Sequence, residues 1–150
     1  MMEEDSHVDT AKDWLAYDDP EGRYVLRFPH EWKVQRESAD RTVIKEPGSR
    51  AEFAISYLAE DCTVAQSMLR GRRLNYYFIR EFTRSIAGRE ALTLEFRDTI
   101  SNIREFRALF PAERGCCELK WTRSEGSEGL EFESTLETML STFDFVSKMS

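Results

Sequence analysis

The chain has 150 residues, which is the usual size of one domain and is long enough to bury a single core. A composition of 41% hydrophobic and 33% charged residues, with only 7 Gly and 4 Pro, excludes a disordered or fibrous chain. The 21 basic and 28 acidic residues leave a net charge of −7, which argues against a general attraction to nucleic acid or to an anionic membrane.

The sequence also indicates where the chain resides and how it divides. No apolar run approaches the roughly 18 residues that a membrane span needs, and the first residues lack the apolar core of a secretory signal. We therefore expect a cytoplasmic protein that makes no membrane contact. Residues 1–14 are polar and are expected to form a tail, followed by a single domain at 15–146 and a short second tail at 147–150.

The domain is predicted to begin with a hairpin. Turn-forming residues at 18–22 separate two short apolar runs, and Pro29 ends the second of them. After this hairpin we expect Trp32 to fold back onto the end of the sheet and residues 33–37 to form another strand.

A second hairpin and a helix are predicted next. Pro47 followed by Gly48 suits a type II turn between strands at 42–45 and 52–58. Thr63 and Gln66 have the spacing of a capping box, which predicts a helix at 64–76. The face that this helix should turn toward the sheet holds Val64, Met68, Gly71, Leu74 and Phe78. Because glycine lowers helix propensity, we expect the backbone to approach the sheet closely at Gly71.

Four strands are predicted in the second half of the chain. They lie at 79–86, 90–97, 103–110 and 116–123, and their short connections make them an antiparallel meander. Alternation predicts one apolar face, formed by Leu92, Leu94, Phe96, Phe106, Phe110, Leu119 and Trp121. The other face is expected to carry Glu95, Arg97, Glu105, Arg107, Glu118 and Lys120. Opposite charges on neighbouring strands would neutralise one another there, on a face open to water that a partner could cover.

A last helix is predicted at 129–142, where apolar residues recur at helical spacing. The chain then closes with Asp144, Phe145 and Val146. Together these elements predict an α+β fold, in which helices flank an antiparallel sheet built from a meander and hairpins.

Three stretches of the sequence carry a resemblance to a known family. GRYVLRFPHEW looks like a strand followed by a Pro-x-x-Trp turn, IAGREALTLEF like a central strand that begins at a glycine, and FESTLETMLSTFDF like a last helix that runs into Phe-x-Phe. In this order they resemble the PsbP-like superfamily, which includes the extrinsic PsbP proteins of photosystem II, a Ran-binding import factor of yeast and small bacterial proteins. With the hairpins, the resemblance covers roughly residues 15–146.

The resemblance implies a fold and a mode of action. It implies a sheet with helices on both faces, an α/β/α sandwich, together with action through protein contacts and no shared catalytic apparatus. Proteins of a similar fold serve as chaperone adaptors for type VI secretion effectors, so an effector chaperone is one alternative. No motif here matches the binding residues of that branch.

Catalytic and metal chemistry find little support in the sequence. His7 lies in the polar tail and His30 in a turn, and neither adjoins a nucleophile motif, so a structural histidine is the simpler interpretation. The 3 cysteines have no CxxC spacing, and no phosphate-binding glycine motif occurs. We therefore expect no metal, nucleotide or other cofactor.

The cysteines are expected to be reduced. An odd number of them, with no export signal, favours three thiols rather than a disulfide. Cys62 precedes the predicted helix, whose N-terminus favours a reactive thiolate, but a small buried cysteine is the more common case.

Two arginines form the clearest basic feature. Arg70 and Arg73 are expected on the solvent side of the helix with no acidic residue four positions away, so they could receive an acidic protein partner. A solvated helix face is the simpler alternative. With the charges of the sheet, the candidate partner-binding residues are Arg70, Arg73, Glu95, Arg97, Glu105 and Arg107.

The sequence thus predicts a bacterial, non-catalytic adaptor or scaffold that acts through protein contacts, with a homodimer as a further possibility. The alternative from another class is a binding module for a small apolar ligand. The aromatic residues Trp32, Tyr76, Tyr77, Phe78 and Trp121 motivate that alternative, although such residues more often form a core.

Overall fold

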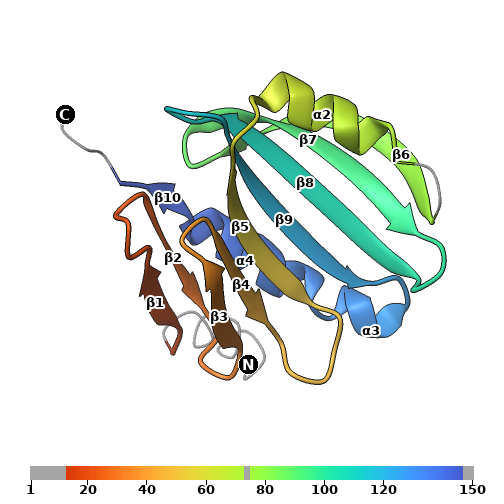
Figure 1. Cartoon of the computed structure of the whole chain (residues 1–150). Coiled ribbons are helices and arrows are strands. Elements are labelled where there is room, and N and C mark those ends of the chain that lie inside the picture. Colours follow the sequence, from red (N-terminus) through yellow and green to blue (C-terminus); the bar gives the residue numbers. More distant parts are fainter. Residues whose placement is uncertain (1–12, 73–74, 147–150) are drawn as a thin grey trace.

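The structure is a computed structural model that describes residues 13–72 and 75–146. This part of the chain folds into two antiparallel sheets with helices beside them (Figure 1). The strands are β1 (Leu15–Asp18), β2 (Tyr24–Phe28), β3 (Lys33–Ser38), β4 (Arg41–Lys45), β5 (Glu52–Leu58), β6 (Tyr76–Ile86), β7 (Arg89–Asp98), β8 (Ile103–Pro111), β9 (Cys116–Ser124) and β10 (Asp144–Phe145). The helices are α2 (Cys62–Arg70), α3 (Ser127–Leu130) and α4 (Glu133–Thr142).

The larger sheet contains the predicted meander. Its seven strands run in the order β3-β4-β5-β9-β8-β7-β6, and each is antiparallel to its neighbours. The smaller sheet has the order β1-β2-β10, so the last residues of the chain pair with the first hairpin. The meander is confirmed, although β6 begins at Tyr76 rather than at residue 79.

The predicted type II turn is confirmed in the second hairpin. Gly48 has a φ of 87°, as the third residue of a type II turn requires, and the Ser49 amide donates to the Glu46 carbonyl. Trp32 folds back onto the core as expected. Its ring is buried and meets the edge of Phe132 at 6.2 Å between centroids.

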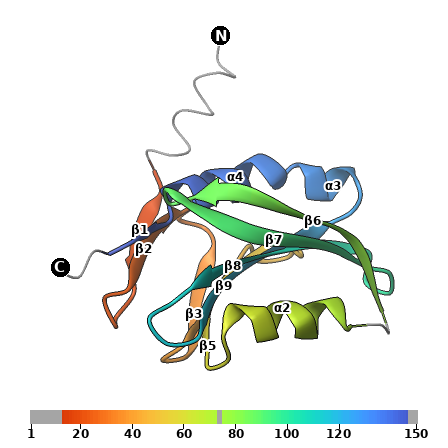
Figure 2. The ribbon, with the colours of Figure 1, turned by 90° about the horizontal axis from the view of Figure 1, so that it is seen from above.

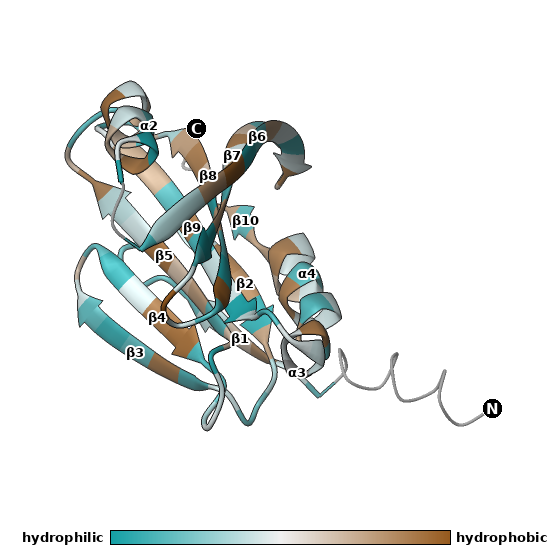
Figure 3. Cartoon of the chain, turned by 90° about the vertical axis from the view of Figure 1, so that its right-hand side faces the viewer, coloured by the Kyte–Doolittle hydropathy of each residue, from teal (hydrophilic) through white to brown (hydrophobic). Residues whose placement is uncertain are grey.

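Helices cover both faces of the larger sheet, as the α+β prediction requires. Helix α2 lies on one face, and α3 and α4 lie on the other (Figures 2 and 3). The main core lies on the α4 side and includes aromatic residues of the smaller sheet. A second, smaller core lies under α2, where Ala65 and Leu69 pack with Leu94, Phe96 and Leu109.

The predicted division of the sheet into one apolar and one charged face is wrong. Residues directly opposite on paired strands point to the same side, and Leu94 pairs with Arg107 while Glu95 pairs with Phe106. The β7–β8 turn therefore shifts the register by one residue relative to our expectation, which moves the whole of β8 to the other face. Both faces consequently carry apolar and charged side chains, and both are covered.

The helix boundaries also differ from the prediction. Helix α2 begins after Asp61, whose carboxylate accepts from the Val64 amide, so the expected capping box at Thr63 is not the cap. The helix ends at Arg70, and Gly71 is its C-cap rather than a point of close approach to the sheet. The last helix is divided into α3 and α4, because the chain turns between Leu130 and Glu133.

Trp14, which we assigned to the N-terminal tail, is buried in the main core. Within the described part of the chain, no helix has the length and apolar character needed to cross a membrane.

Candidate functional site

The six predicted partner-binding residues do not form one surface. Arg70 lies on α2, and Arg73 lies outside the described residues. Glu105 and Arg107 lie on the α2 side of the sheet. Glu95 and Arg97 lie on the opposite side, so the structure separates two pairs that we expected to be neighbours.

A chain of ion pairs runs through the α2 side of the sheet. Glu105 accepts from Arg72 at 2.9 Å and from Arg107 at 2.7 Å. Arg107 also contacts Glu118 at 2.8 Å, and both carboxylates are buried. Burial alone would raise the pKa of Glu105, but the charges and hydrogen bonds of Arg107 and Arg72 outweigh it and hold that pKa below its usual range. These charges are therefore neutralised within the fold.

A second set of ion pairs lies on the α4 side. Glu95 is buried and contacts both Arg80 and Arg104. Glu125 contacts Arg104 at 2.7 Å and Arg97 at 3.7 Å, and its hydrogen bonds raise the pKa of Arg104. The expectation of a water-open charged face is thus wrong, because the carboxylates that define it are buried and paired.

Helix α2 exposes the side chains that we expected it to bury. Its buried residues are Ala65 and Leu69, whereas Met68 is 60% exposed and Val64 is 45% exposed. Val64 and Met68 lie one turn apart, so they form a continuous apolar strip on the outside of the helix. The capping box at Thr63 predicted the helix start two residues too late, and the correct cap, Asp61, gives no sign in the sequence of which face is buried.

Arg70 lies two positions after Met68, on the opposite flank of the helix from this strip. Its guanidinium contacts Glu81 of β6 at 3.1 Å and lies over the Phe78 ring at 4.9 Å, while the side chain keeps 51% of its surface exposed. Gln66, one turn earlier, donates to the same Glu81 carboxylate at 3.1 Å. Arg70 is the single charged residue in the sequence of α2, CTVAQSMLR, so the exposed face of the helix is apolar and basic.

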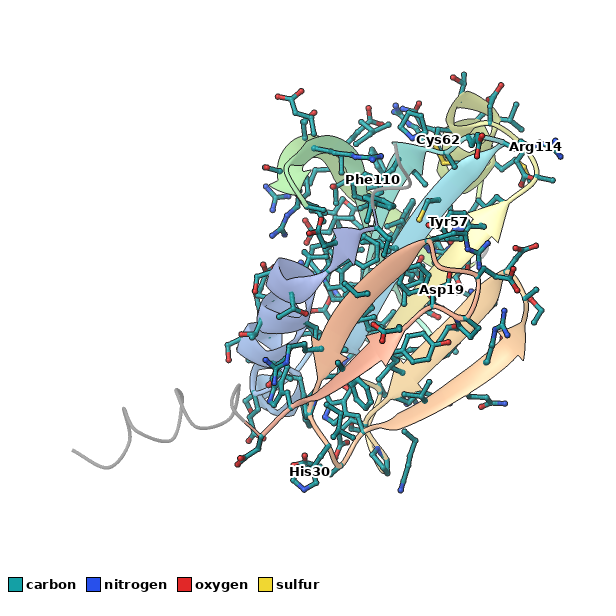
Figure 4. The ribbon with its side chains drawn as sticks, turned by 90° about the vertical axis from the view of Figure 1, so that its left-hand side faces the viewer. Asp19, His30, Tyr57, Cys62, Phe110 and Arg114 are labelled. Carbon is teal, nitrogen blue, oxygen red and sulfur yellow. A yellow bond between two sulfur atoms is a disulfide. The ribbon has the colours of Figure 1, made fainter. Side chains whose placement is uncertain are left out.

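A disulfide joins α2 to the sheet, which corrects the prediction of three reduced thiols. Cys62, the first residue of α2, is bonded to Cys116, the first residue of β9. Figure 4 shows Cys62 at the same end of the molecule as Arg114 of the β8–β9 turn. Leu58 pairs with Cys116 at the end of β5, which brings Cys62 within reach only four residues later. Because the two cysteines meet only in the folded chain, their spacing in the sequence does not reveal the disulfide.

The third cysteine points to the other face of β9. Cys117 is free and fully buried in the main core, close to Tyr57. Burial raises the pKa of Cys117 to about 12, so its thiol stays protonated at neutral pH.

Two of the hollows on the surface of the described residues are lined mainly by polar residues. The larger, of about 690 Å³, lies between the β4–β5 turn and the α3 region and is lined by Glu46, Pro47, Gly48, Ser49, Arg50, Ser124, Gly129, Glu131 and Phe132. The smaller, of about 240 Å³, is lined by Lys45, Ser49, Arg50, Ala51, Glu52, Tyr76, Asp98, Ile103, Glu105, Lys120 and Thr122. Neither offers the apolar walls that a small apolar ligand would need.

The remaining candidates for chemistry are dispersed. His30 is well exposed and contacts Glu31 at 3.4 Å, and His7 lies outside the described residues. Among the residues that the structure describes, no three His, Cys, Asp or Glu side chains gather in an arrangement that could hold a metal ion.

No protein-family model and no curated protein matches the chain. Among solved structures, it is similar to the solution structure of the cyanobacterial PsbP protein of Synechocystis sp. PCC 6803, with 14% identity, a TM-score of 0.62, and coverage of 89% of this chain and 92% of that one. A mutant of the protein Mog1 is similar at 10% identity and a TM-score of 0.55, with 90% and 97% covered. The chain has the PsbP-like fold.

A further structure with this fold comes from Bacteroides thetaiotaomicron, at 10% identity and a TM-score of 0.58. The match covers 91% of this chain but only 50% of that one, so the present chain spans half the length of that protein. The PsbP-like fold accounts for the order of the elements and for the helices on both faces of the sheet. At these identities the likeness concerns the fold alone.

Proposed function

We propose that this domain is a non-catalytic adaptor that binds a protein partner through the outer face of α2. The observation that carries the proposal is the exposure of Met68 and Val64 one turn apart, on a helix that also exposes Arg70 on its other flank. Methionine, other apolar side chains and arginine are the composition that the centres of protein interfaces favour.

The chemistry of this face defines the partner. The chain as a whole carries a net charge of −7, yet α2 contains one arginine and no acidic residue. An acidic segment that crosses the helix would therefore fit it, because an apolar side chain of the segment would pack on Met68 and a carboxylate would meet Arg70. That carboxylate would share the guanidinium with Glu81, which accepts a hydrogen bond from it in the free protein.

Helix α2 also has the rigidity that an interface needs. The disulfide fixes its first residue to the sheet. A partner would meet a surface that is already ordered, so binding would lose little conformational entropy.

A peptide-display selection on the purified domain tests this function. We expect enriched peptides to combine Asp or Glu with one large apolar residue. In calorimetry with an enriched peptide, Met68→Glu and Arg70→Gln should each weaken binding by about tenfold, the effect of losing one good contact.

Two matched controls keep the test specific. Ile100→Glu changes an apolar side chain that is 75% exposed on the β7–β8 turn, and Lys33→Glu reverses a charge on the exposed strand β3. Both should leave affinity within about twofold, the usual effect of a substitution outside an interface. Enrichment of basic peptides, equal losses in the controls, or a Met68→Glu effect on self-association instead of peptide binding would overturn the proposal.

The predicted location and chaperone role stay predictions. Disulfides persist mainly in oxidising compartments, so the Cys62–Cys116 bond weighs against the cytoplasmic location that the sequence suggested. An effector chaperone and a homodimer remain alternatives that the same selection and a sedimentation experiment would separate.

A further inference from the structure

We infer that the Cys62–Cys116 disulfide is a reducible latch that fixes α2 on the sheet, and that Cys62 is the sulfur at which thiol exchange begins. This inference goes beyond the proposed function, since it concerns how α2 is held and does not depend on any partner.

The first argument is the weakness of the other contacts that hold α2. Of its nine residues, only Ala65 and Leu69 are buried, and both belong to the smaller core. The bonds from Gln66 and Arg70 to Glu81 lie in exposed positions, where each contributes little. A short helix with so little burial does not stay ordered through its own propensity.

The second argument is the construction of the latch. Gly115 precedes Cys116 in the β8–β9 turn, and a Cβ at this glycine would lie 1.9 Å from the carbonyl oxygen of Leu58. Only a glycine lets this turn lie against the end of β5, which is where Cys116 meets Cys62. The backbone is thus shaped to bring the two sulfurs together.

The third argument is access to the two sulfurs. Cys116 is fully buried in the smaller core, whereas Cys62 is partly exposed at the start of α2. A thiolate from solvent can therefore reach the Cys62 sulfur more readily than its partner. Cys117 cannot compete, because it lies buried on the opposite face of β9.

A dithiol reductant reduces the Cys62–Cys116 disulfide in two exchange steps. The attacking thiolate forms a bond to the Cys62 sulfur, the Cys62–Cys116 bond breaks, and its electron pair leaves on the Cys116 sulfur, which takes up a proton. The second thiol of the reductant, after losing its proton, then attacks the mixed disulfide and releases Cys62. The protein gains two thiols, and the reductant leaves as a disulfide.

Reduction has a defined structural consequence. Once the latch opens, α2 can leave the sheet and uncover Leu94, Phe96 and Leu109, which are all buried in the closed form. The domain would then have two states that differ in the apolar surface it presents.

Thiol mapping and amide exchange on the full chain test the latch. In the purified oxidised protein, alkylation after denaturation should label Cys117 alone. Brief treatment with reduced glutathione, whose single thiol carries out only the first step, followed by acid quenching should trap the mixed disulfide on Cys62. After complete reduction, the amides of α2 should exchange roughly tenfold faster, as expected when a local opening becomes easier, while those of α4 stay unchanged.

A variant and its control separate the latch from general instability. Cys62→Ser with Cys116→Ser should show the fast α2 exchange with or without reductant, and Cys117→Ala should respond to the reductant as the natural chain does. If the double variant does not fold, the amide exchange of α2 in the natural chain, before and after reduction, is the test of the latch. Three labelled thiols in the oxidised protein, a mixed disulfide on Cys116, or unchanged α2 exchange after reduction would overturn the inference.

Discussion

At the scale of single residues, Gly115 is a position where the fold leaves no room for a side chain. It has a φ of 81°, and a Cβ would lie 1.9 Å from the Leu58 carbonyl oxygen. Gly88 has a similar φ of 74°, but nothing lies within 4 Å of the place where its Cβ would be. Substitutions at the two glycines can therefore separate the cost of backbone strain from the cost of a steric contact.

We expect Gly115→Ala to lower the free energy of unfolding by about 3 kcal/mol or more, because strain and contact act together. Gly88→Ala should lower it by about 1 kcal/mol, since only the left-handed conformation is penalised. Urea denaturation followed by tryptophan fluorescence measures both. Equal losses in the two variants would show that the Leu58 contact does not constrain the turn.

Glu105 gives the second prediction at this scale. Its carboxylate is buried between Arg72 and Arg107, so Glu105→Gln removes the charge that pairs with two partly buried guanidinium groups and should cost about 3 kcal/mol. Glu31→Gln, at an exposed position, should change stability by less than about 0.5 kcal/mol. A loss below about 1 kcal/mol for Glu105→Gln would contradict the buried network.

The Glu105 carboxylate also makes the stability of the domain depend on pH. The pKa of Glu105 is lower in the folded protein than its ordinary value, so its stabilisation is complete above that ordinary value and is lost as the pH falls through the folded one. We expect the free energy of unfolding to decrease below about pH 5, and to decrease less steeply in Glu105→Gln. Denaturation curves at a series of pH values would show equal slopes if the carboxylate were not paired.

At the scale of elements, α2 shows what a local motif can and cannot predict. The sequence placed a helix here, because apolar residues and a capping pattern occur together. Asp61 and Thr63 both suit a helix start, whereas the spacing of Val64 and Met68 assigned them to the core, although both are exposed. Only packing against the sheet decides between faces that are separated by a rotation of one residue.

The two candidate caps can be distinguished by experiment. Asp61→Ala removes the bond to the Val64 amide and should cost about 1 kcal/mol. Thr63→Ala should change stability by less than about 0.5 kcal/mol, because the exposed Thr63 side chain makes no capping bond to the helix. Thermal unfolding of both variants measures the two losses of stability. A larger loss for Thr63→Ala than for Asp61→Ala would support Thr63 as the helix cap.

At the scale of the whole molecule, the positions of the strands could be predicted from the sequence, whereas the register between β7 and β8 could not. Alternation located β4, β5 and the meander within a few residues, because their turns contain clear signals at Gly48 and Gly88. The β7–β8 turn has no such signal, and a shift of one residue exchanged the faces of β8. Four of the six candidate residues, Glu95, Arg97, Glu105 and Arg107, were grouped by that assumed register, and the structure divides them between the two faces of the sheet.

The disulfide acts at this same scale, since it joins residues 54 positions apart. Chain entropy predicts that replacing Cys62 and Cys116 together lowers the free energy of unfolding by about 4 kcal/mol. Cys117→Ala, which removes only a buried thiol, should lower it by about 1 kcal/mol. If reductant destabilised the natural chain no more than it destabilises the double variant, the bond would contribute nothing.

The measurement that tests the central claim most directly is an amide-exchange footprint of the domain with a bound acidic peptide from the selection. We predict that protection rises at residues 62–72 and at the facing part of β6 around Glu81, and that Met68→Glu abolishes this protection while Ile100→Glu preserves it. Protection confined to the two polar hollows, to the edge strand β3 or to the smaller sheet would contradict a partner site on α2.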